Sequence, residues 1–160
     1  MKKSALIGAF VFVILVGGFL FVVMSPSNAG VDLSAFNVDG MKIYKSATCG
    51  CCTLYTQYME KKSNIDVEAQ TVQDTTAVKK EFGVPMEMES CHTTMIGGYF
   101  VEGHVPLEAI AKLLTEKPDI AGIAMPGMPT GSPGMPGSKQ GPFTVYAVSE
   151  DGTFKEFMTL

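Results

Sequence analysis

The sequence predicts an α/β fold, and two observations lead to this prediction. In some short segments apolar and polar residues alternate, as in β-strands. Between them lie segments whose apolar residues recur at helical spacing. Turn-forming residues separate them, so the expected order is strand, helix, strand, helix, strand, strand and helix. The chain has 160 residues, and the part after the first thirty has the size of one compact domain.

The first half of this domain supplies the strand–helix–strand–helix portion. Residues 42–46 hold a short apolar patch that suits a buried strand. Residues 52–62 are predicted to form a helix, and the lysines at its end suit a helix C-terminus. Residues 65–69 alternate as a second strand, and Asp74 is expected to cap a helix that runs to Gly83. The apolar and aromatic residues of the first helix are Leu54, Tyr55, Tyr58 and Met59.

The second half supplies a hairpin and a third helix. Residues 93–101 are broken by a pair of glycines and predict a two-stranded hairpin. Pro106 is expected to begin a helix, because an apolar stripe with helical spacing follows it. Residues 125–138, mostly Gly, Pro, Ser and Met, are expected to form a long loop. Residues 143–148 and 153–158 then predict a C-terminal β-hairpin.

This order of elements is that of a thioredoxin-like β-α-β-α-β-β-α core, extended by a Met/Pro/Gly-rich loop and a C-terminal hairpin. In such a fold the N-terminus of the first helix faces the loop that enters the third strand. We therefore expect the cluster Cys49-Gly50-Cys51-Cys52 to lie beside the distant pair Cys91-His92.

Residues 1–30 are interpreted as a targeting segment that precedes a metal-binding domain at residues 31–160. Lys2 and Lys3 come before an uncharged apolar stretch from Ala5 to Met24, which is long enough to cross a bilayer. The positive pair favours a cytoplasmic N-terminus, so the domain is expected to be periplasmic or otherwise extracytoplasmic. A retained anchor in the inner membrane, formed by residues 5–24, is preferred over a signal peptide cleaved after Ala29.

The charge of the expected domain excludes one class of partner. After residue 30 the chain carries ten lysines, no arginine and sixteen acidic residues, which gives a net charge of −6. A basic surface for nucleic acid is therefore absent. The acidity helps solubility and is weak evidence for attraction of cations.

The cysteine spacing favours a metal site over two disulfides. Three of the four cysteines lie within residues 49–52, and a bond between such close neighbours is expected to strain the backbone. Thiolates are soft ligands that prefer Cu(I) and zinc, and a helix N-terminus should lower the pKa of Cys52 and Cys51. Nearly contiguous cysteines favour several Cu(I) ions bridged by sulfur. A single zinc ion with four ligands is the alternative.

Histidine and methionine extend the candidate ligand set. His92 is expected to bind metal beside Cys91, the alternative being that both are strand residues of the core. His104 suits either a hydrogen bond within its loop or a role as an outer ligand. Met128 and Met135 share a flexible loop with Met125, and their thioethers are soft enough to bind copper or guide it to the site, although methionine is also common core filler.

Several separated motifs in one order resemble the CopG-like copper-resistance family, long described only as a domain of unknown function with a CGCC motif. They are Thr48-Cys49-Gly50-Cys51-Cys52, Ser90-Cys91-His92-Thr93, Val101-Glu102-Gly103-His104-Val105-Pro106 and the glycine–proline–methionine segment 126–135. The resemblance covers residues 41–160. One departure is the absence of tryptophan, which is expected in many relatives near the first helix.

The resemblance implies a periplasmic or membrane-facing protein of copper resistance with a thioredoxin-like fold. It implies that Cys49, Cys51, Cys52 and Cys91 hold copper, as a thiolate-bridged cluster, with His92 beside them. Copper exporters or periplasmic copper-handling proteins are the partners that it suggests. Whether the protein also interconverts Cu(I) and Cu(II) as an enzyme is left open.

Two other functions compete with copper binding. The first is thiol-disulfide oxidoreductase activity, since Cys49 and Cys52 have the two-residue separation that such enzymes use. Cys51 is expected to divert their disulfide, and Cys91-His92 occupies the loop where those enzymes keep a proline. The second is a structural module that binds a partner and carries inert thiols, which explains the cysteine cluster poorly.

Overall fold

The structure is a computed structural model that describes residues 31–160 of the chain. The expected targeting segment, with its apolar stretch Ala5–Met24, lies outside the described residues. Within residues 31–160, none of the helices has the length and apolar character needed to span a membrane.

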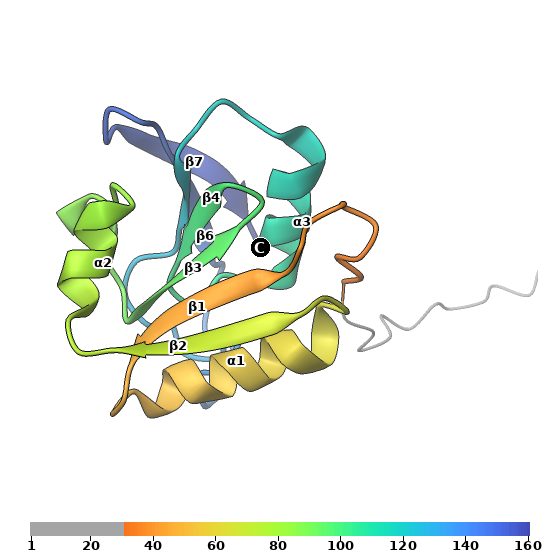
Figure 1. Cartoon of the computed structure of the whole chain (residues 1–160), viewed down its shortest axis with the longest axis vertical. Helices are drawn as coiled ribbons and strands as arrows, with labels where there is room; N and C mark the ends of the chain where they lie inside the picture. The colour runs from red at the N-terminus through yellow and green to blue at the C-terminus, as the bar shows by residue number, and fades with distance from the viewer. Residues whose placement is uncertain (1–30) are drawn as a thin grey trace, which may run out of the picture.

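The described residues form one mixed sheet with helices packed against it (Figure 1). The strand order is β2-β1-β3-β4-β5-β6-β7, with β1 parallel to β2 and antiparallel to β3. The strands are β1 (Met41–Ser46), β2 (Val67–Val72), β3 (His92–Ile96), β4 (Tyr99–Glu102), β5 (Gly122–Ala124), β6 (Thr144–Val148) and β7 (Phe154–Thr159). The helices are α1 (Gly50–Lys62), α2 (Thr75–Glu81) and α3 (Leu107–Glu116), with a 3-10 turn η1 (Met86–Met88). The predicted thioredoxin-like α/β fold is therefore confirmed.

The two faces of the sheet carry separate apolar cores. Tyr55 and Met59 of α1 pack with α3 and with side chains such as Val101 of β4. The neighbouring Phe100 packs instead with Val84 and Met88 in a second cluster. Because successive side chains of a strand point to opposite faces, the two clusters lie on opposite sides of the sheet. Figure 1 shows α2 set apart from both α1 and α3.

The C-terminal part of the sheet contains a strand that the sequence does not reveal. The strand β5 pairs with β4 in parallel and with β6 antiparallel, so the predicted hairpin of β6 and β7 extends the central sheet. Three residues are too few to show a periodicity. A Cβ at Gly122 would lie 2.3 Å from the Phe100 carbonyl oxygen, so this close pairing needs glycine.

Three further details of the prediction are corrected. The first helix begins at Gly50 rather than Cys52, because the side chain of Cys49 accepts a hydrogen bond from the Cys52 amide and so caps the helix. Leu54, counted as part of the apolar stripe, is 51% exposed. Met125 follows β5 directly and is only 1% exposed, so it is a core residue and not a mobile methionine of the loop.

Helix capping elsewhere follows the sequence closely. Asp74 caps α2 as expected, and its carboxylate accepts hydrogen bonds from the amides of Thr76 and Ala77. Pro106 is the residue before α3 rather than its first helical residue, a shift of one position. These local signals fix where each helix begins relative to the candidate site.

Candidate metal centre

All four cysteines lie together where the N-terminus of α1 meets the start of β3. Cys49 caps α1, Cys51 and Cys52 lie in its first turn, and Cys91 directly precedes β3, which pairs with β1. The Sγ atoms of Cys49 and Cys51 are 3.5 Å apart, and those of Cys51 and Cys91 are 4.0 Å apart. The four sulfur atoms all lie within 4.8 Å of one another. The fold therefore brings together residues that are forty positions apart in sequence.

Cys49 and Cys52 form a disulfide bond in this structure, which corrects the expectation that the close spacing of the cysteines disfavours a disulfide here. Cys49 caps the helix and Cys52 lies in its first turn, which brings their Cα atoms to 5.3 Å. That separation is within the usual range for a disulfide. The low-pKa thiolate expected for Cys52 is thus not present in this oxidised form, whereas Cys51 and Cys91 are free thiols.

His104 lies closer to the sulfur atoms than its expected outer position. Its Nε2 atom is 2.9 Å from Cys91 Sγ, and its Nδ1 atom is 2.7 Å from the carbonyl oxygen of Pro133. A carbonyl oxygen only accepts, so Nδ1 carries the proton and donates it. The Nε2 lone pair therefore faces Cys91, an orientation in which metal-binding histidines are commonly held.

His92 is fully buried next to the same thiol. Its Nδ1 atom is 3.6 Å from Cys91 Sγ, and its Nε2 atom has no hydrogen-bond partner among the described residues. Burial lowers the pKa of His92 well below its ordinary value, and the neighbouring His104 and Lys79 act in the same direction. Burial and the two neighbouring groups therefore keep the His92 ring neutral, which is the form that binds metals.

Tyr55, a core residue of α1, packs against both imidazoles, although its sequence pattern indicates only an apolar helix residue. Its ring centroid lies 4.4 Å from that of His92 and 5.5 Å from that of His104. Its hydroxyl donates to the carbonyl oxygen of Val105 over 2.9 Å. The tyrosine thus packs against both rings from α1 and holds the start of the segment that leads to α3.

Protonation in the metal-free site is set mainly by burial. Burial raises the pKa of Cys91 to about 11, and the adjacent Cys51 adds to the rise. Burial also lowers the pKa of His104, although its bond to Pro133 opposes that shift. Near neutral pH a protonated Cys91 thiol therefore donates to a neutral His104 ring, and a soft metal ion would displace the thiol proton.

The glycine–proline–methionine loop packs against the cysteine turn. A Cβ at Gly134 would lie 2.6 Å from the Tyr55 amide nitrogen and 2.9 Å from the Cys51 carbonyl oxygen, so the loop backbone approaches α1 closely. Met135 is half-buried, and Met128 is 55% exposed.

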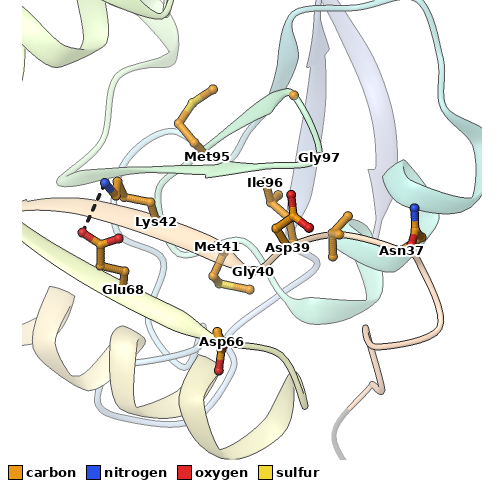
Figure 2. Close-up of a pocket in the computed structure, with 12 residues that line it drawn as sticks. Asn37, Asp39, Gly40, Met41, Lys42, Asp66, Glu68, Met95, Ile96 and Gly97 are labelled. Atoms are coloured by element: carbon orange, nitrogen blue, oxygen red, sulfur yellow. Dashed lines mark ion pairs between the residues drawn. The ribbon is translucent and has the colours of Figure 1, made fainter.

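The groove at the opposite end of β1 has a different chemistry. It encloses about 780 Å³ and is lined by residues 37–42, Asp66, Glu68 and residues 95–98 (Figure 2). Lys42 and Glu68 form an ion pair of 3.2 Å across it. No cysteine or histidine lines this groove. The thiol and imidazole donors of the described residues thus gather at the other end of the strand.

A thioredoxin-like fold with four sulfur atoms and two imidazoles at one helix N-terminus defines a metal-binding thiol protein. Two solved structures titled copper resistance protein copG, form 2 and form 1, are 39% identical to this chain. They cover 76% of it and 97% and 96% of their own chains, with TM-scores of 0.70 and 0.69. The chain belongs to the CopG-like copper-resistance family.

The other comparisons agree with this assignment or add nothing to it. The model of a family described as a protein of unknown function, DUF411, matches residues 88–135, which include Cys91, both histidines and the methionine loop. No match was found among the curated proteins.

Proposed function

We propose that this protein is an extracytoplasmic copper-binding protein that holds Cu(I) through Cys49, Cys51, Cys52 and Cys91 and serves copper resistance. The single observation that carries the proposal is the convergence of four sulfur atoms within 4.8 Å, at a place where a buried imidazole nitrogen faces one of them. Membership of a copper-resistance family supports copper as the metal.

The donor set fits a sulfur-bridged cluster of Cu(I) ions. Thiolate is a soft ligand that selects Cu(I), and a thiolate sulfur has lone pairs enough to bridge two ions. With four sulfur atoms so close together, each bridging sulfur serves more than one ion. His104 would supply a further nitrogen through Nε2, and His92 packs beside it with an Nε2 that has no hydrogen-bond partner within residues 31–160. His104 is therefore the stronger candidate of the two histidines.

Zinc is the alternative metal for the same donors. Four sulfur atoms, or three with one imidazole, satisfy a single tetrahedral zinc ion. One zinc ion per chain would leave some of the donors unused, whereas a copper cluster uses them all. The number of metal ions bound per chain thus distinguishes a copper cluster from a single zinc ion.

Binding by all four sulfurs requires the Cys49–Cys52 disulfide to be reduced first. The reduction takes two electrons and two protons, and it turns two sulfur atoms without charge into two thiols that can ionise. Oxidation of the two thiols back to the disulfide releases two electrons and two protons, and two electrons reduce two Cu(II) ions to Cu(I). We therefore include interconversion of Cu(I) and Cu(II) at this dithiol in the proposal.

Thiol-disulfide exchange is the second candidate function, and the Cys49–Cys52 disulfide favours it. The bond lies at the N-terminus of α1 in a thioredoxin-like fold, Cys49 is partly exposed, and Cys52 is buried. An exposed sulfur of a disulfide is open to attack by a substrate thiolate. Cys51, 3.5 Å from Cys49 Sγ, has no function in such an exchange.

The surroundings of the site complete the proposal. Residues 1–30 would anchor the domain to the inner membrane or export it, and copper exporters or other extracytoplasmic copper-handling proteins would be its partners. Met128 and Met135, in the loop that packs on the cysteine turn, would guide copper to the thiolates. Thioethers bind Cu(I) more weakly than thiolates, which suits transfer.

An anaerobic titration of the fully reduced protein with Cu(I) tests the proposal. Metal content and sulfur-to-copper charge-transfer absorption are followed together, with a Cu(I) chelator as competitor. The expected result is more than one copper ion per chain, with fewer in Cys51→Ser. Tight binding of one zinc ion alone would favour the zinc site. Rapid disulfide exchange without copper binding, unchanged in Cys51→Ser, would favour the oxidoreductase.

A further inference from the structure

A buried ion pair lies next to the metal centre but outside its donor set. Lys79 of α2 donates to Oε1 of Glu102 at the end of β4, and the side chains are 3% and 0% exposed. Glu102 shares its face of the sheet with Phe100, two residues earlier, and not with the face that α1 covers. The pair therefore lies on the opposite side of the sheet from His92 and Tyr55.

Stability alone explains such a pair poorly. Removing two charges from water is costly, and well-packed apolar residues in their place are often as stabilising or more so. Burial raises the pKa of Glu102, and the ammonium of Lys79 is the main opposing influence. Lys79 thus favours the charged form of Glu102, in which both carboxylate oxygens accept hydrogen bonds. The groups that donate to these two oxygens indicate the role of the ion pair.

The carboxylate holds both sides of the Cys91-His92 pair. Oε1 of Glu102 accepts a hydrogen bond from the Ser90 amide over 2.6 Å, and Oε2 accepts one from the Thr93 hydroxyl over 2.6 Å. Lys79 also donates to the Thr93 hydroxyl over 3.2 Å. Cys91 precedes β3, so its position depends on these flanking bonds rather than on strand pairing.

The same residues connect the Cys91 segment to His104 and to the methionine loop. The Ser90 hydroxyl donates to the Gly127 carbonyl over 2.5 Å, and the Met125 amide donates to the Glu102 carbonyl over 3.0 Å. A Cβ at Gly103 would lie 2.5 Å from the Met125 carbonyl oxygen and 2.8 Å from the Ser90 side chain. His104 follows this tightly packed glycine, so its place relative to Cys91 is set by the same contacts.

We propose that Lys79 and Glu102 are positioning residues of the metal centre, which hold Cys91 within reach of His104 and Cys51 from the opposite face of the sheet. This inference rests on the proposed copper function. Neither residue belongs to the cysteine and histidine groups that could hold a metal ion. The effect of the pair passes through the Ser90 amide and the Thr93 hydroxyl to the segment that carries Cys91.

The test uses the full chain and a double variant, Lys79→Met with Glu102→Gln. A single Glu102→Gln leaves a lone buried ammonium without a counter-charge, which risks unfolding. The double variant removes both charges while keeping similar volumes. Thr93→Val is a milder second variant that deletes one hydroxyl and keeps the ion pair. Val148→Ala, in the apolar cluster on the same face, is the control for lost stability without lost positioning.

The first readout needs no metal. Alkylation of Cys91 by iodoacetamide is followed by peptide mass spectrometry in the oxidised, metal-free protein, where Cys51 and Cys91 are the free thiols. The double variant is expected to react about tenfold faster at Cys91. Loss of one charge-assisted hydrogen bond lowers the free energy of local opening around Cys91, so the thiol is exposed more often. Thr93→Val should show a smaller increase, and Val148→Ala none beyond its loss of global stability.

The second readout is the Cu(I)-loaded protein. The double variant is expected to show a shifted charge-transfer band and weaker Cu(I) retention against a chelator, while Val148→Ala keeps the wild-type band. An unchanged alkylation rate and band in the folded double variant would overturn the inference. So would failure of that variant to fold, which would assign the pair to stability. If the wild-type chain binds no Cu(I), the proposed function fails, but the alkylation rates still decide the positioning role.

Discussion

The two ends of β1 show that a cavity and a binding site are different things in this protein. At its N-terminal end a groove of about 780 Å³ is open to solvent and lined by carboxylates, a lysine and apolar side chains such as Met41 and Met95 (Figure 2). At its C-terminal end the strand leads into a tightly packed turn, where four sulfur atoms and two imidazoles meet. The chemistry lies where donors converge and are oriented, not where the surface is hollow.

The difference arises from which chain segments meet at each end. The groove joins the start of β1 to the turn between β3 and β4, and neither segment contributes a cysteine or a histidine. The other end joins the N-terminus of α1 to the start of β3, and each segment contributes cysteine. The fold brings the two segments together at each end of β1, and the residue types in those segments decide which ligands that end can bind.

The largest effect is expected from removing the cysteine that comes from the distant segment. Cys91→Ser removes the sulfur nearest to His104 and leaves an oxygen that Cu(I) binds poorly. We expect the multi-ion cluster to be lost, measured as copper ions per chain after anaerobic loading and desalting. The matched change at the other end of β1, Asp66→Asn in the groove, should leave copper content unchanged. Equal losses of copper in the two variants would contradict the assignment of the metal centre to the C-terminal end of β1.

Oxidation of the Cys49–Cys52 pair should have the next largest effect. In that form two of the four sulfur atoms are not thiolates, so only Cys51, Cys91 and the imidazoles remain. We expect the oxidised protein to bind fewer copper ions than the reduced protein, with capacity restored by a reductant that is then removed. The measurement is metal content at a fixed excess of Cu(I) under argon. Equal capacity in both forms would contradict the assignment of Cys49 and Cys52 as ligands.

A smaller effect is expected from the histidine that faces Cys91. His104→Gln removes the Nε2 lone pair and the ring held by Pro133. We expect Cu(I) to be bound about tenfold or more weakly, the size usual for loss of an oriented group at a metal site. A competition titration measures the change. If His92→Gln weakens binding more than His104→Gln does, the order assigned to the two histidines is wrong.

The smallest predicted effect is that of the tyrosine that packs on both imidazoles. Tyr55→Phe deletes the hydroxyl bonded to Val105 and should lower the free energy of unfolding by about 1–2 kcal/mol. Tyr99→Phe deletes a bond of similar length, to the Pro118 carbonyl, at the opposite end of the β3–β4 hairpin from Cys91. Chemical denaturation of both variants should show similar losses, whereas a small change in Cu(I) affinity is expected only for Tyr55→Phe.

Most of the fold could be predicted because each element has a local signal. Asp74 and the paired glycines Gly97 and Gly98 mark a helix start and a turn by their chemistry, and the structure agrees at each. The strand β5 could not be predicted, because three small residues carry no periodicity and their place comes from pairing with distant strands. Met125 was likewise assigned to the loop by its neighbours, although β5 directs it into the core.

The candidate site was only partly accessible to sequence reasoning. The order of elements predicts that Cys91 meets the cluster at Cys49, and the sulfur distances agree. The close spacing disfavours a disulfide between Cys49 and Cys52, but the structure contains one, because the cap and first turn of α1 bring the two residues together. Lys79 and Glu102 were missed, although a charge in the otherwise apolar segment Tyr99–Glu102 is a signal that could have revealed them.

The proposal that four cysteine sulfurs and His104 hold a Cu(I) cluster is tested most directly by X-ray absorption at the copper edge of the reduced, loaded protein. The account predicts Cu(I) with mainly sulfur neighbours, a minor nitrogen contribution that is lost in His104→Gln, and a copper–copper scattering component from bridged ions. A spectrum of isolated copper ions with mainly oxygen and nitrogen neighbours would contradict it.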